Sequence, residues 1–129
     1  MKRCQKLLLP AAAFVIGLLN TTGIPALMVL SVLAPVLAAI QPTRARAAGA
    51  IGMYYAACTL PVAGVLYNFA GFVHALIFGP LICLVACSLL ALPFAALWSR
   101  DRVLAALGMP LAITAVTVPP LGIVGVGNP

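Results

Sequence analysis

Residues 72–98 read FVHALIFGPLICLVACSLLALPFAALW and contain one histidine but no lysine, arginine, aspartate or glutamate. As a helix this run would be about 40 Å long, and the hydrocarbon core of a bilayer is about 30 Å thick. Its last residue is Trp98, a residue type that gathers at membrane interfaces. The segment therefore predicts a transmembrane helix over 72–98.

The composition of the whole chain agrees with this prediction. Of its 129 residues, 65% are hydrophobic and only 6% are charged, whereas an average soluble domain has about 25% charged residues. So small a chain cannot bury that much apolar surface inside itself. A soluble enzyme, a nucleic-acid module and a disordered tail are excluded, and residues 1–129 are expected to form a single multi-span membrane domain.

Turn residues divide the rest of the chain into further helices. The uncharged run from Leu7 to Ile40 would be about 51 Å long as one helix, too long for one span, and Asn20 to Pro25 carry turn chemistry in its middle. Pro61 is expected to kink its helix without ending it, and Asn68, Gly71 and His74 mark a short break. We therefore predict an all-α fold with an early helical hairpin and helices at 7–19, 24–40, 47–67, 72–98 and 103–118.

Basic residues predict the orientation of these helices. The net charge of +6 comes from three short clusters, which are too small to neutralise a row of nucleic-acid phosphates. With five spans and a cytoplasmic N-terminus, all of these cationic residues lie on the cytoplasmic side, as the positive-inside rule requires. The predicted topology is N-in and C-out, with these determinants: Lys2, Arg3, Lys6, Arg44, Arg46, Arg100 and Arg102.

Two alternatives for the N-terminal region stay open. One is a single kinked or strongly tilted helix across residues 7–40, which would place Arg44 and Arg46 opposite the N-terminal cluster. The other is a long pilin-type leader with a cleavage site at Ala45 to Ala47, although an ordinary signal peptide has an apolar region of only about 7–15 residues.

The inventory of reactive side chains favours no catalytic or metal site. Cys83 and Cys87 share a helix face, but we expect the cysteines to behave as small hydrophobic residues, since no further metal ligand is nearby. His74 is the only histidine and Asp101 the only acidic residue of the chain. They are predicted to lie on opposite membrane faces. We therefore expect no catalytic residue, no bound cofactor and no metal, and small residues at 47–57 and 86–106 favour close helix packing.

The C-terminal segment, residues 118–125 and then Asn128-Pro129, reads VPPLGIVG followed by NP. It resembles the N-terminal membrane region of conjugal transfer proteins of the TraB type, and the motif residues are Pro119, Pro120, Gly122 and Gly125. The short basic N-terminus, the early hairpin and the basic loop before an Ala/Gly-rich helix are also similar. Val126 stands where the family tends to carry an aromatic residue.

The resemblance implies a relative of apolipoprotein N-acyltransferases, in which a membrane domain carries an extracytoplasmic carbon–nitrogen hydrolase domain with a Glu-Lys-Cys site. This chain contains no glutamate, so we expect residues 119–129 to begin a missing continuation and the chain to be the membrane anchor without its catalytic domain. The expected location is the bacterial inner membrane, with the lipid bilayer and possible conjugation machinery as partners. A complete small membrane subunit without chemistry is the alternative, and an oligomeric channel or exporter is a third hypothesis.

Overall fold

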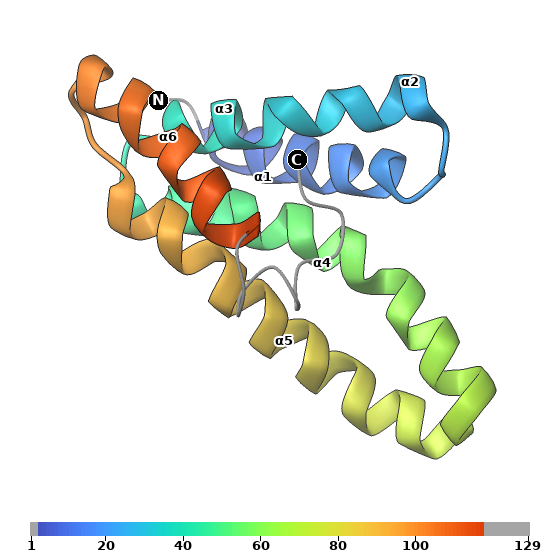
Figure 1. Ribbon diagram of the computed structural model, residues 1–129. Coiled ribbons are helices and arrows are strands. Elements are labelled where there is room, and N and C mark those ends of the chain that lie inside the picture. The colour runs from blue at the N-terminus through green and yellow to red at the C-terminus, as the bar shows by residue number, and fades with distance from the viewer. Residues whose placement is uncertain (1–2, 118–129) are drawn as a thin grey trace.

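The computed structural model describes residues 3–117, and every regular element in that part of the chain is a helix. The predicted all-α fold is therefore confirmed for these residues (Figure 1). The elements are α1 (Arg3–Asn20), α2 (Pro25–Met28), the 3₁₀ helix η1 (Val29–Val32), α3 (Leu33–Ala39), α4 (Arg44–Ala70), α5 (Phe72–Leu97) and α6 (Arg102–Thr117).

The helices begin and end close to the predicted positions, with informative differences. α4 starts at Arg44 because the Thr43 hydroxyl accepts the backbone N–H of Arg46 and caps the helix. The predicted break over 68–72 is reduced to Gly71, whose φ of 84° ends α4 before α5 begins at Phe72. α4 continues through Pro61, as predicted. Trp98 falls just beyond α5 instead of within it.

The second helix of the early hairpin is interrupted, which the sequence pattern did not predict. Pro35 lacks an N–H and its ring crowds the carbonyl group of Ser31 one turn earlier. The backbone responds with 3₁₀ geometry over Val29–Val32 before α3 resumes the α-helix. The change lies where the Ser31 side chain is buried in the bundle.

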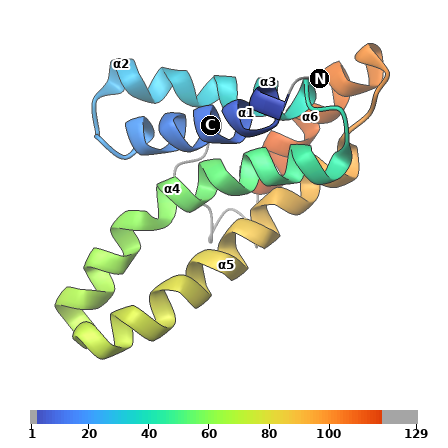
Figure 2. The ribbon, with the colours of Figure 1, turned by 180° about the vertical axis from the view of Figure 1, so that it is seen from behind.

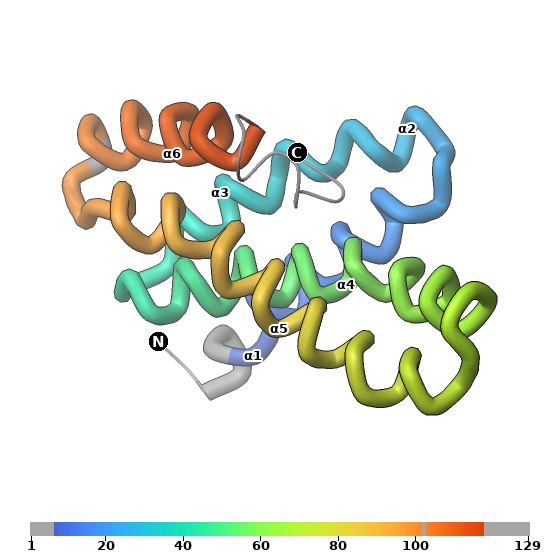
Figure 3. The backbone as a smooth tube through the Cα atoms, turned by 60° about the horizontal axis from the view of Figure 1, so that its bottom comes forward, coloured from blue at the N-terminus to red at the C-terminus, as the bar shows by residue number. Residues whose placement is uncertain are grey.

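The architecture is a long helical hairpin with shorter helices packed on one half of it. α4 and α5 run antiparallel and contact each other, and their junction at Gly71 projects beyond the other helices (Figures 1 and 2). α1 and α3 pack on α4, while α6 folds back beside α5 and also contacts α3 (Figure 3). The buried residues of α4 accordingly fall between Ala47 and Thr59.

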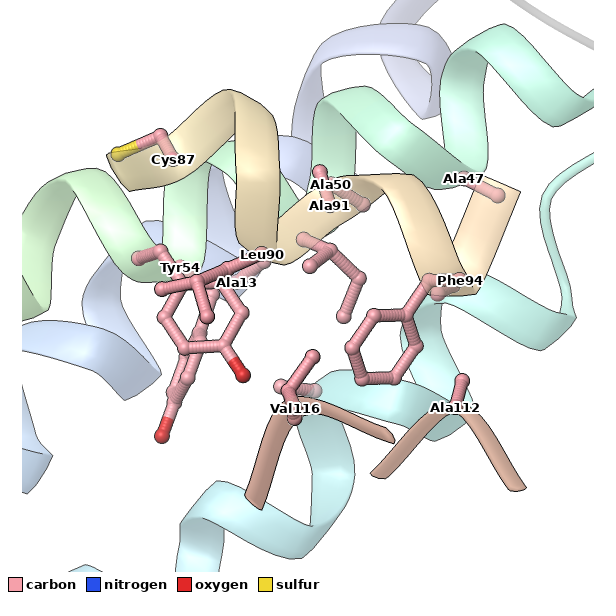
Figure 4. Close-up of a cluster of buried hydrophobic side chains, with 14 of the residues drawn as sticks. Ala13, Ala47, Ala50, Tyr54, Cys87, Leu90, Ala91, Phe94, Ala112 and Val116 are labelled. Carbon is pink, nitrogen blue, oxygen red and sulfur yellow. The ribbon is translucent and has the colours of Figure 1, made fainter. Parts of the chain in front are cut away.

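Alanines fill much of the interior beside a few large side chains, while many large apolar side chains face outward. Figure 4 shows the centre, where alanines such as Ala13, Ala50 and Ala112 surround a few larger residues. Bulky aliphatic and aromatic side chains face outward instead, including Leu84, which is 66% exposed. A soluble protein buries its large apolar residues, whereas membrane helices pack through small ones.

Two of the described helices are long and apolar enough to cross a membrane, namely Arg44–Ala70 and Phe72–Leu97. The other apolar segments are shorter: Leu7–Asn20, Pro25–Ala39 and Val103–Thr117. By length and composition, α4 and α5 are therefore the two candidate membrane spans among the described helices.

Candidate functional site

A buried polar cluster joins the end of α1 to the middle of α4. The Asn20 amide nitrogen donates a hydrogen bond of 3.1 Å to the Tyr54 hydroxyl oxygen and lies 3.9 Å from the Cys58 sulfur. The Cys58 thiol in turn donates to the carbonyl oxygen of Gly17 at 3.7 Å. All three side chains are buried. The cluster fixes how α1 lies on α4, and it contains no group charged at neutral pH.

A second polar cluster lies between α4 and α5. The Thr59 hydroxyl oxygen is 3.0 Å from the Cys83 sulfur, and the same hydroxyl donates to the carbonyl oxygen of Ala56. The Cys83 and Cys87 sulfurs are 3.7 Å apart, so these cysteines share one helix face as predicted. Both clusters satisfy polar groups in apolar surroundings, where an unpaired one would be costly.

The structure keeps His74 and Asp101 at opposite ends of α5. His74 is exposed in the first turn, where its ring stacks on Phe78 with centroids 6.1 Å apart. Asp101 follows the last turn, and its Oδ1 accepts the backbone N–H groups of Val103 and Leu104 at 2.7 and 3.2 Å. The carboxylate thus caps α6, and no triad combines these residues.

No thiol in the described part has a catalytic base beside it. Along α5, Cys83 follows His74 by about 14 Å, beyond the reach of proton transfer. Cys58 and Cys87 are buried among apolar residues. Within residues 3–117 the described side chains also form no group of three histidine, cysteine or acidic residues that would hold a metal ion.

Positively charged residues gather at one end of the bundle. The start of α1, the loop from Ile40 to Thr43 and the loop from Trp98 to Asp101 all lie at the left in Figure 1. The Trp98 indole N–H donates to the carbonyl oxygen of Gln41 at 3.2 Å and ties the two loops together. We call this region the basic end; its described basic side chains are Arg44, Arg46 and Arg100.

Apolar grooves run along the outside of the helices. One, of about 390 Å³, lies between α4 and α5 and is lined by Gly49, Gly52 and Cys87 among others. A larger one, of about 610 Å³, lies between α3 and α6 and includes Val36 and Met109. Neither contains a charged side chain, so they suit apolar chains or helices and not polar substrates.

Comparison with known proteins adds no relative: no family model matches the chain, and no curated protein and no solved structure is similar to it. The motif residues Pro119, Pro120, Gly122 and Gly125 lie outside the described residues. So does Lys2.

The sequence pattern predicts a turn at Asn20 and an interfacial Trp98, but it does not predict their tertiary hydrogen bonds. Asn20 bonds to a residue 34 positions away, and Trp98 to one 57 positions away. The only available signal was polarity inside an apolar chain, because a buried amide or indole N–H requires a partner.

Proposed function

We propose that this chain is a multi-span anchor in the bacterial inner membrane, with five membrane helices formed by α1, α2–α3, α4, α5 and α6. The observation that carries the proposal is the large number of bulky apolar side chains that face outward from the bundle. In water, such a surface would leave side chains such as Leu76 and Phe72, 63% and 65% exposed, without apolar contacts. In a bilayer, lipid tails cover them.

The proposed orientation has the basic end in the cytoplasm, N-in and C-out. The start of α4 and the loop after α5, which are far apart in the sequence, bring Arg44, Arg46 and Arg100 to this end of the bundle. The opposite turns, from Asn20 to Ile24 and at Gly71, contain no lysine or arginine. Such an asymmetry is the pattern that orients membrane proteins.

Helix lengths fit this proposal if the long pair is tilted. α4 and α5 have 27 and 26 residues, or about 40 and 39 Å, whereas α6 has 16 residues, or about 24 Å. Long spans tilt and short ones thin the bilayer around them, each at modest cost. The projecting Gly71 end would then lie at the outer face.

A topology reporter inserted into the full chain tests the orientation. Insertion after Arg46 should give a cytoplasmic signal, and insertion at Gly71 a periplasmic one. Periplasmic activity after Arg46 would contradict five spans and would favour a single fused N-terminal helix. A soluble chain after cell fractionation would contradict the membrane assignment itself.

For the biological role, we propose the membrane anchor of a conjugal transfer protein of the TraB type. The support is the similarity of residues 118–125 and of the hairpin and basic loop. Because the chain contains no glutamate, a Glu-Lys-Cys hydrolase site must belong to another part of such a protein. Sequencing downstream of codon 129 tests this: an open frame encoding that site supports it.

A complete small subunit that packs on a larger membrane protein is the second candidate, and the groove between α4 and α5 favours it. A Cβ atom added at Gly49 or Gly52 would meet nothing within 4 Å, so a partner helix has room to approach. A genuine stop codon after residue 129 would favour this candidate over the TraB-type anchor.

A further inference from the structure

A third groove lies at the basic end, between the start of α4, the end of α5 and the first turns of α6. It has a volume of about 440 Å³. We call it the basic groove, and the residues used below are Arg44, Trp98, Arg100, Leu104, Leu107 and Leu111. Figure 3 shows how α6 turns back beside α5, and residues of both helices line the groove.

The polar mouth of the basic groove has a net positive charge, because it has two arginines and only one carboxylate, Asp101, nearby. Arg44 and Arg100 are both exposed, and the structure records no ion pair for either of them in the part it describes. The nearby Asp101 carboxylate uses Oδ1 to accept two backbone N–H groups of α6. α4 also begins at Arg44, so the positive end of its helix dipole adds to the field.

The floor of the basic groove is apolar. Leu104, Leu107 and Leu111 follow one face of α6 and are 58%, 61% and 59% exposed. From the first to the last they extend about 10 Å along the helix, away from the arginines. A ligand that contacts both the arginines and the leucines must combine an anionic group with an apolar chain. A free inorganic anion would leave the leucines uncovered.

We propose that the basic groove binds an anionic phospholipid, with its phosphate between Arg44 and Arg100 and an acyl chain along the three leucines. This inference rests on the proposed membrane insertion. Basic pockets between membrane helices at the cytoplasmic side are suited to anionic headgroups. Because the two arginines come from different elements, one phosphate bridging them also holds the α5–α6 loop against α4.

Trp98 is the only tryptophan of the chain and lines the basic groove, so it reports on lipids bound there. The experiment uses the full chain in vesicles of phosphatidylcholine and phosphatidylglycerol, with one lipid or the other brominated to quench tryptophan fluorescence. Brominated phosphatidylglycerol should quench Trp98 more strongly at equal mole fraction. Arg44→Gln and Arg100→Gln should each lower the relative affinity for the anionic lipid about fivefold.

Arg46→Gln is the matched control, because it removes the same charge from α4 at a half-buried position outside the groove. It should keep the preference, and Arg44→Lys should retain most of it, which separates charge loss from misfolding. Equal quenching by both lipids, or equal losses in the Arg44 and Arg46 variants, would overturn the site while leaving membrane insertion intact. Absence of quenching by either lipid would contradict the proposed insertion instead.

Discussion

The amide of Asn20, the last residue of α1, donates a 3.1 Å hydrogen bond to the hydroxyl of Tyr54 in the middle of α4. Tyr54 is fully buried and Asn20 is 6% exposed. The bond joins two polar groups in apolar surroundings, where burying a polar group without hydrogen bonds is costly. The pair therefore fixes the position of α1 along the axis of α4.

A double-mutant cycle on Asn20→Leu and Tyr54→Phe should show a coupling of about 1 kcal/mol, the usual size for a hydrogen bond between membrane helices. Each single variant should lower the free energy of unfolding in mixed micelles, followed by circular dichroism under a denaturant. Tyr54→Phe also removes other contacts of that hydroxyl, which the cycle cancels. Strict additivity would mean that the bond does not contribute to stability.

Gly17 should tolerate no larger residue. A Cβ atom there would meet the backbone carbonyl of Tyr54 and lie 2.8 Å from the Ala57 Cβ, so α1 would have to move away from α4. We expect Gly17→Ala to lower the free energy of unfolding by about 2 kcal/mol. Gly64→Ala is the matched control, because its new methyl group meets nothing within 4 Å and helix propensity favours alanine. Equal stability of the two variants would contradict the close α1–α4 contact.

The junction between the long helices should also require glycine, for a different reason. Gly71 has φ 84° and ψ 169°, a backbone region that is open almost only to glycine, although it has free space around it. Gly71→Ala should cost about 1–3 kcal/mol through backbone strain. Thermal unfolding in micelles measures the loss, again relative to Gly64→Ala. An unchanged midpoint would show that the junction adopts another conformation.

The positions of the helices could be predicted because their boundaries are local. Asn20 to Pro25, Gly71 and the charged turn around Asp101 each end or begin a helix through their own backbone or side-chain chemistry. The predicted start at 47 was wrong by three residues, because the Thr43 cap begins α4 at Arg44. The 3₁₀ segment at Val29–Val32 was missed, although Pro35 carried its cause.

The tertiary contacts could not be predicted in this way. Arg44 and Arg100 are far apart in the sequence, and nothing local indicates that α6 folds back to place both on one groove. Thr59 and Cys83 meet for the same reason, since their pairing depends on the register of α4 against α5. Apolar periodicity specifies that helices pack, but small residues on several faces allow more than one register.

The last prediction is that the purified chain has no amidase or acyltransferase activity. Acyl transfer needs a nucleophile with a base within hydrogen-bond reach. The Cys83 sulfur has the Thr59 hydroxyl beside it, which is no base at neutral pH, and His74 lies about 14 Å away along α5. The only acidic residue, Asp101, caps the start of α6 and follows the end of α5 that is opposite to His74.

Incubation of the chain in lipid with a thioester or phospholipid acyl donor, followed by mass spectrometry, checks this prediction. We expect no turnover, while a single labelling event at Cys4 would reveal only a reactive thiol. Turnover that disappears in Cys58→Ala, Cys83→Ala or Cys87→Ala would contradict the anchor proposal. Such a result would require the α4–α5 interface to open and bring a base to the thiol, because the closed packing leaves none within reach.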